Sequence, residues 1–158
     1  MIPAFKVTAL RMGLLKTVDY SQLIYLRDIG KKVDVPTWGV LLQGQGKNIV
    51  VDLGIYDPVW ASQNILTCVR EEFDDPVAAI RKAADLGPEE IDYVIFTHLH
   101  WDHIGETLKP FTSARFVVQE REWDYMFHPT PFQKWAYTSS LKVCLDPEID
   151  PFQWQFVT

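Results

Sequence analysis

Residues 91–105, IDYVIFTHLHWDHIG, place an apolar run directly before a cluster of three histidines and one aspartate. The run at 91–96 is continuous and rich in β-branched side chains, which is typical of a strand buried on both sides. A strand of this kind lies in the interior of a sheet rather than at its edge. The polar cluster is therefore predicted to hang from the end of a central strand.

Several segments before this run have the pattern of strands. Residues 5–12 and 22–27 are short apolar or β-branched runs and are predicted as strands. Residues 40–43 and 48–52 are also strand-like, and Gly44 and Gly46 between them supply a tight turn. This part of the chain is predicted to form a β-hairpin.

One helix is predicted between the hairpin and the central strand. Asp74 or Asp75 is the expected N-cap, Pro76 the first helical residue and Gly87 the stop signal. Three apolar side chains share one face of this helix and predict its packing on a sheet: Val77, Ile80 and Ala84.

The segments after the cluster continue the alternation. We predict a strand at 114–119, a short helix at 120–127, and a proline-interrupted, aromatic-rich connection at 128–147. The final FQWQFVT alternates apolar and polar residues like the interior of a strand. A strand-rich start followed by β-α-β alternation predicts a mixed α/β layered fold, in a single domain over residues 1–158.

Composition excludes several function classes. A formal charge of −6, without any Lys/Arg run, argues against nucleic-acid binding and favours a small-molecule substrate. The first 17 residues lack the features of a signal peptide, and no apolar run reaches the roughly 20 residues of a membrane span, so a cytoplasmic location is expected. Cys68 and Cys144 form no C-x-x-C pair and are expected to be free, partly buried thiols.

The polar cluster has the spacing of a metal site. His98, His100 and Asp102 alternate along the chain, so an extended backbone turns them toward one side. His103 breaks this alternation and joins the others only if the chain turns at Asp102. Nitrogen and oxygen donors together suit zinc, and also iron, manganese or cobalt. Four such dense ligands would strain a single tetrahedral site, which favours two adjacent ions, one held by His98 and His100 and the other by Asp102 and His103.

Plainer interpretations compete with a metal site. The cluster could be exposed loop residues, or core histidines bonded to carbonyl groups, but H-x-H-x-D-H arises by chance in roughly one of several thousand such chains. Trp101 either lines a pocket beside the metals or anchors the loop in the core. The aromatic residues between 123 and 137 either line a substrate or subunit surface or pack on the domain's own sheet. His128 is expected to be a surface or loop residue, with a stand-in metal ligand as the alternative.

These motifs resemble a known family. THLHWDHIG is similar to the H-x-H-x-D-H signature of the metallo-β-lactamase superfamily of hydrolases, and IVVDLG at 49–54 resembles that family's preceding strand with its aspartate-containing turn. ARFVVQEREWDYM at 114–126 is most similar to the branch that contains N-acyl homoserine lactonases. The resemblance covers approximately residues 37–127 and implies an αββα sandwich, of which this chain would form the first half.

The resemblance also implies a site and a reaction. His98 and His100 match ligands of a first zinc ion, Asp102 and His103 match ligands of a second, and Asp52 matches an acid that supports the site from behind the ligands. The implied reaction is hydrolysis of a lactone or related ester by a metal-activated hydroxide, with Asp102 also able to relay a proton. The alternatives are another ester, thioester or phosphodiester hydrolase on the same scaffold, or a non-catalytic fragment.

The chain departs from the family pattern downstream. The family supplies a third histidine, a bridging aspartate and a last histidine after the H-x-H-x-D-H segment, and no residue here matches them. We therefore expect the 158 residues to be the N-terminal half of the family's domain. The missing ligands would come from a complementary C-terminal half or from a homo-oligomer.

Overall fold

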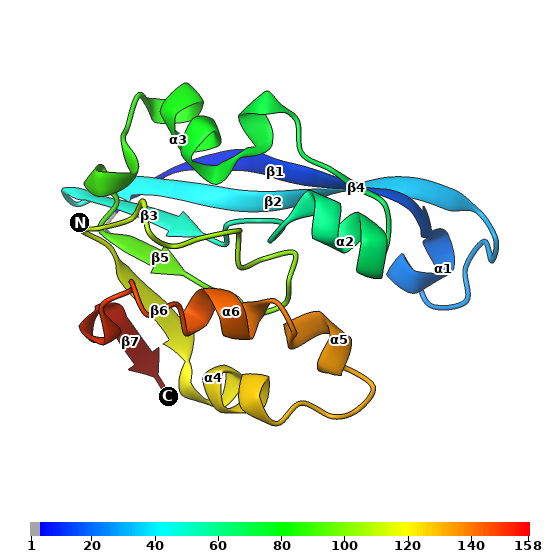
Figure 1. Cartoon of the computed structure of the whole chain (residues 1–158). Helices are drawn as coiled ribbons and strands as arrows, with labels where there is room; N and C mark the ends of the chain where they lie inside the picture. The colour runs from blue at the N-terminus through cyan, green and yellow to red at the C-terminus, as the bar shows by residue number, and fades with distance from the viewer. Residues whose placement is uncertain (1–3) are drawn as a thin grey trace.

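The structure, a computed structural model, describes residues 4–158 and forms one seven-stranded sheet in the order β4-β1-β2-β3-β5-β6-β7. The predicted mixed α/β fold is confirmed, because helices follow or connect most of these strands (Figure 1). The strands are β1 Lys6–Asp19, β2 Lys32–Gly44, β3 Lys47–Val51, β4 Cys68–Val69, β5 Tyr93–Ile95, β6 Arg115–Gln119 and β7 Trp154–Val157. The α-helices are α1 Tyr20–Leu23, α2 Pro58–Asn64, α3 Pro76–Ala84, α4 Glu120–Phe127, α5 Lys134–Tyr137 and α6 Ser140–Cys144.

The sheet has an antiparallel part and a parallel part. Strands β4, β1, β2 and β3 pair antiparallel, and the long β1–β2 pair extends past the other strands to α1 (Figure 1). Strands β3, β5, β6 and β7 pair parallel to one another. The carboxyl ends of β3 and β5 therefore meet at one edge of the sheet, and this edge receives both Asp52 and the histidine cluster.

The core lies on one face of the sheet. Neighbouring strands contribute fully buried side chains to this face, and Ile80 of α3 and Met126 of α4 belong to the same cluster. These strand residues are Leu41, Val50, Val94 and Phe116. The helices thus provide the layer that covers this face, as the apolar stripe on α3 predicts.

The opposite face of the sheet is apolar and only half-buried. Four side chains lie side by side on it in register and outside the core cluster: Val40, Val51, Ile95 and Val117. The prediction that 91–96 is buried on both sides is therefore wrong for one side. Tyr93 and Ile95 are half-buried because the helices of residues 4–158 pack on the other face.

The predicted hairpin and helix are confirmed, with small shifts at their ends. The β2–β3 turn is formed by Gln45 and Gly46, both with positive φ (54° and 70°), whereas Gly44 is the last residue of β2. Asp75 caps α3, its side chain accepting from the Val77 and Ala78 amides. The helix ends at Ala84 and is followed by Asp85, which adopts the left-handed conformation expected of a glycine, two residues before Gly87.

Other predictions need correction. Residues 22–27 are no strand, because Asp19 caps the short helix α1 and the chain then turns through Leu26 and Asp28 with positive φ. The strand predicted at 5–12 continues to Asp19 through two irregularities in its pairing with β2. The connection at 128–147 contains α5 and α6. The strand at 114–119, the helix at 120–127 and the final strand are confirmed.

Both cysteines are free, as predicted, and are buried rather than partly buried. Burial raises the pKa of the Cys68 thiol to about 11, and burial raises that of Cys144 further. Among the described residues, no helix has both the length and the apolar character needed to cross a bilayer. The prediction that the first 17 residues form no signal peptide falls partly on residues 1–3, which lie outside the described residues.

Candidate metal centre

The histidine cluster lies on a loop that is held against the end of β3. Asp52 follows β3 and donates its amide to the carbonyl of Ile95, the last residue of β5 (2.9 Å). Further along, the Leu53 amide donates to the His103 carbonyl (2.8 Å) and the Gly105 amide to the Gly54 carbonyl (2.9 Å). The two loops therefore run side by side, and the polar side chains of both meet at the same place.

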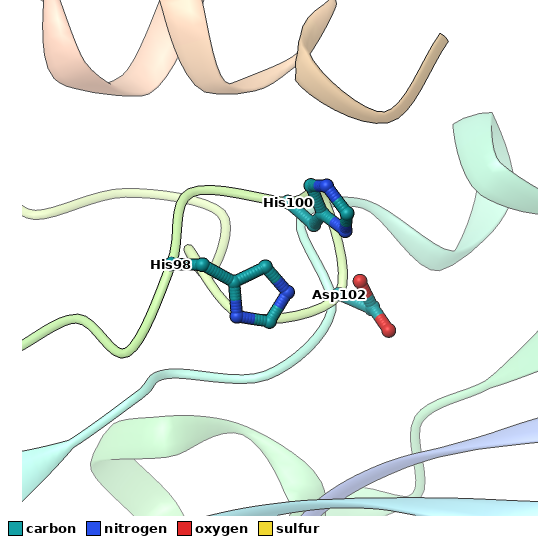
Figure 2. A group of neighbouring side chains, drawn as sticks. All are labelled: His98, His100 and Asp102. Atoms are coloured by element: carbon teal, nitrogen blue, oxygen red, sulfur yellow. The ribbon is translucent and has the colours of Figure 1, made fainter. Parts of the chain in front are cut away.

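Three of the predicted ligands converge. One ligand atom each from His98, His100 and Asp102 lies within 4.8 Å of the other two, and all three side chains are half-buried (Figure 2). Zinc binds imidazole nitrogen and carboxylate oxygen at about 2.0–2.2 Å, so only small side-chain rotations would bring these atoms around one ion. The donor set and its spacing therefore fit a divalent metal.

His103 lies beside this group. Its Nε2 is 3.8 Å from Oδ2 of Asp102, and its ring centroid is 4.0 Å from that of His98. Asp102 therefore lies within 4.8 Å of ligand atoms of His98 and His100 and 3.8 Å from Nε2 of His103, close enough to serve an ion held by either group. The structure brings all four predicted ligands together, and their division between two ions stays a prediction.

Asp52 lies behind the cluster and fixes the tautomers of two histidines. Its buried carboxylate accepts from Nδ1 of His103 (2.8 Å) and from the amide and hydroxyl of Thr97 (2.9 and 2.7 Å). An ionised carboxylate only accepts, so Nδ1 of His103 carries a proton, and in the neutral imidazole Nε2 keeps its lone pair for a metal ion. The Thr97 hydroxyl, already donating to Asp52, can accept from Nδ1 of His98 at 3.1 Å, which likewise leaves Nε2 of His98 free.

The electrostatic environment shifts the pKa values of the three histidines in different directions. Burial lowers the pKa of His98 and of His100, and the neighbouring imidazoles lower that of His98 further. Burial also opposes the charge of His103, but the hydrogen bond to Asp52 and the charge of Asp102 outweigh it and raise its pKa. At neutral pH, His98 and His100 are therefore neutral and ready to bind a metal.

A second group of supporting residues comes from the connection at 128–147 and the helix before it. The Leu99 amide donates to Oε1 of Glu122 (2.8 Å), and the Ser140 hydroxyl donates to the Leu99 carbonyl. Sequence reasoning missed Thr97, Glu122 and Ser140, because a polar residue in a loop or helix carries no local sign of a distant partner. The segment 114–126 contains two glutamates, Glu120 and Glu122, and nothing in the sequence distinguishes one from the other.

The structure decides between the alternatives for Trp101 and for Trp123. Trp101 is 3% exposed and anchors the loop in the core, where its amide donates to the Ala136 carbonyl (3.0 Å). Trp123 packs against Trp154 with ring centroids 4.6 Å apart, so it belongs to the domain's own sheet.

Three other aromatic residues of this segment are exposed, Phe127, Phe132 and Trp135, as is His128 at the end of α4. Phe132 and Trp135 line a groove of about 610 Å³ with the end of β1 and the end of α2. Packing on the domain's own sheet is confirmed for Trp123, whereas a substrate or subunit surface at Phe132 and Trp135 stays a prediction.

A family model described as Metallo-beta-lactamase superfamily matches residues 33–157. Among curated proteins, the chain is similar to N-acyl homoserine lactonase AiiA of Bacillus thuringiensis subsp. kurstaki, with 28% identity over 127 residues that cover 74% of this chain and 50% of that protein. It is also similar to N-acyl homoserine lactonase AttM of Azorhizobium caulinodans, with 32% identity over 66% of this chain and 34% of that protein. The chain thus spans about half the length, or less, of these relatives.

Solved structures show the same relationship. A crystal structure of a quorum-quenching N-acyl homoserine lactone lactonase superposes with a TM-score of 0.69 at 26% identity, covering 99% of this chain and 58% of that one. AidC, a dizinc quorum-quenching lactonase, superposes with a TM-score of 0.64 at 16% identity, covering 99% and 62%. The second likeness, at its low identity, concerns the fold alone.

Proposed function

The chain belongs to the metallo-β-lactamase superfamily, and from this premise we propose that it supplies metal ligands of a hydrolase that opens a lactone or a related ester. The observation that carries the proposal is the convergence of His98, His100 and Asp102 within 4.8 Å at the carboxyl edge of the parallel strands. His103, with its tautomer fixed by Asp52, is the fourth ligand.

The residues of this chain have distinct roles in the proposed reaction. His98 and His100 bind through neutral imidazoles, because burial keeps their pKa low. Asp102 lies within reach of both neighbouring ligand positions, and its carboxylate can also take up a proton released during hydrolysis. When bound, one or two divalent ions, zinc first and iron, manganese or cobalt as alternatives, polarise the carbonyl and lower the pKa of water.

Similarity supports the choice of substrate. The relatives with 28% and 32% identity are both named N-acyl homoserine lactonases. Because the chain spans about half of such relatives, we propose that further ligands come from a complementary C-terminal segment or from another copy of the chain. The cytoplasmic location stays a prediction.

Metal content and lactone opening test the proposal together. The purified chain, loaded with zinc, is measured for bound metal by elemental analysis and for ring opening of N-hexanoyl homoserine lactone by titration of the released acid. We expect His98→Ala and Asp102→Asn each to lower zinc affinity more than 10–100-fold, because each removes a ligand. His128→Ala, at an exposed histidine outside the cluster, is the matched control and should change neither quantity.

The outcomes separate the alternatives. Zinc bound as tightly by the His98 and Asp102 variants as by the unaltered chain would overturn the metal site. Bound zinc with hydrolysis of a thioester or phosphodiester, and none of the lactone, would assign another hydrolase reaction to the same scaffold.

A further inference from the structure

The backbone of Leu99, the residue between His98 and His100, is held by side chains on both of its polar groups. Its amide donates to Oε1 of Glu122 on α4 (2.8 Å), and its carbonyl accepts from the Ser140 hydroxyl on α6. Leu99 itself is fully buried. The segment that carries the two histidines is therefore clamped to the helical layer at its midpoint.

Glu122 also reaches one of the two histidines through an aromatic ring. The same Oε1 atom accepts from the hydroxyl of Tyr137 on α5 (2.8 Å). The Tyr137 ring is buried and stands nearly perpendicular to the His100 imidazole, with centroids 4.8 Å apart and an interplanar angle of 82°. One carboxylate oxygen thus connects the backbone between both histidines to the ring that packs on His100.

The position of Glu122 in the first turn of α4 does not by itself explain its hydrogen bond to the histidine loop. Glu120 and Glu122 both lie in its first turn, where an acidic side chain favours the helix dipole. Only Glu122 bonds to the histidine loop, whereas Glu120 is exposed. A charged acceptor makes a stronger hydrogen bond to an amide than a neutral one does, so Glu122 suits the task of fixing a loop.

We infer that Glu122 is a positioning residue for the metal centre, acting through the Leu99 amide and Tyr137 to aim His98 and His100 at one point. This inference rests on the proposed function, since it takes these two histidines to be ligands. Small errors in ligand placement weaken a metal site strongly, and supporting hydrogen bonds are what prevent them.

The first test measures metal binding, with cobalt(II) and zinc as probes. We expect Glu122→Ala to lower zinc affinity 10–100-fold in a competition with a chromophoric chelator, and to change the visible absorption bands of bound cobalt(II) at saturation. Glu122→Gln keeps a neutral acceptor for the Leu99 amide and should lose less zinc affinity than Glu122→Ala. Glu120→Gln and Glu120→Ala, which alter the same helix turn, should leave affinity and spectrum unchanged.

Tyr137→Phe isolates the second connection. It removes the hydroxyl and keeps the ring, so we expect a loss of zinc affinity smaller than that of Glu122→Ala. Unfolding by urea without metal serves as the stability control for every variant. If Glu122→Ala fails to fold, Glu122→Gln decides, and unchanged affinity and cobalt spectrum in that folded variant would overturn the inference.

The second test needs no metal and separates this inference from the proposed function. In NMR spectra of the metal-free chain, we expect Glu122→Gln to shift the imidazole signals of His98 and His100 but not those of His128. Glu120→Gln should shift none of them. Should the unaltered chain bind neither probe metal, the proposed function fails, and these spectra still decide whether Glu122 orients the histidines. Identical signals in the Glu122→Gln variant would contradict the inference.

Discussion

Asp52 shows how one residue prepares several others. Its backbone has a φ of 59°, a left-handed conformation that aspartate and asparagine tolerate better than most residues. This turn at the end of β3 allows the carboxylate to reach Thr97 and His103, which are 45 and 51 positions away in the sequence. A single buried acid thereby sets the protonated nitrogen of His103 and, through Thr97, that of His98.

The histidines of the metal-free chain should titrate in a fixed order. A raised pKa keeps a proton at higher pH, so as pH falls His103 should become charged above its ordinary value of 6.5. His98 and His100, whose pKa is lowered, should stay neutral until the pH is below 6.5. Asp52→Asn removes the charged acceptor and should lower the pKa of His103, as measured by NMR titration of the imidazole signals.

Asp85→Asn is the control for this titration, because Asp85 also has a positive φ and is exposed at the end of α3. It should leave all three titration curves unchanged. If His103 proved to be the last of the three to gain a proton, the assigned role of Asp52 would be wrong.

At the scale of the elements, local signals decide where strands and helices begin and end. The β2–β3 hairpin forms because two continuous apolar segments flank a turn whose two residues both adopt positive φ. Helix α3 begins where Asp75 accepts from two free amides and Pro76 occupies the first helical position. Each of these features depends on residues close together in the chain.

The hairpin turn can be improved. Gln45 occupies a left-handed conformation that costs most residues energy, and Asn-Gly is a favoured pair for such a turn. We expect Gln45→Asn to raise the free energy of unfolding by about 0.5–1 kcal/mol, measured by urea denaturation. Gln63→Asn, at an exposed position in α2, is the matched control and should not raise the free energy of unfolding. A less stable Gln45→Asn variant would show that the turn differs from the one described.

The cap of α3 can be removed. Asp75→Ala takes away the acceptor for the Val77 and Ala78 amides, so we expect a loss of about 1 kcal/mol in the free energy of unfolding. Asp75→Asn, which can still accept a hydrogen bond, should lose less. Asp124→Ala, at an exposed position within α4, is the control. An equal effect of Asp75→Ala and Asp124→Ala in urea denaturation would argue against the cap.

At the scale of the whole molecule, the sheet is covered on one face only by the elements of residues 4–158. The helices and the histidine loop pack on the face that contains Leu41, Val50 and Val94. The opposite face carries an apolar row in register, and Val7 of β1 and Trp38 of β2 are 66% and 52% exposed. Apolar surface of this kind marks a contact site for another layer of protein.

Self-association should therefore depend on the uncovered face. We expect the chain to associate in a concentration-dependent manner in sedimentation experiments, and the double change Ile95→Thr with Val117→Thr to weaken this association. Threonine keeps the β-branched shape that suits a strand, so the fold should persist. Val59→Thr, at an exposed position on α2, is the control. Unchanged association of the double variant would exclude the face as the contact site.

The sequence by itself determined the parts of this protein that depend on near neighbours. Apolar patterns and turn residues within short windows predict the hairpin, the capped helix α3 and the strand before the histidines. The donor chemistry and close spacing of His98, His100 and Asp102 predict the metal site. The family resemblance added Asp52 as a supporting acid, and the structure places its carboxylate 2.8 Å from His103.

Only the tertiary structure decided which distant residues meet. It paired Glu122 with Leu99 and Tyr137, and Ser140 with the Leu99 carbonyl. It also showed that Ile95 faces the uncovered side of the sheet, and that Trp101 belongs to the core. The physical reason is that an apolar or polar pattern specifies that a side chain needs a partner or a covering layer, whereas the order of strands and the packing of helices specify which partner it finds.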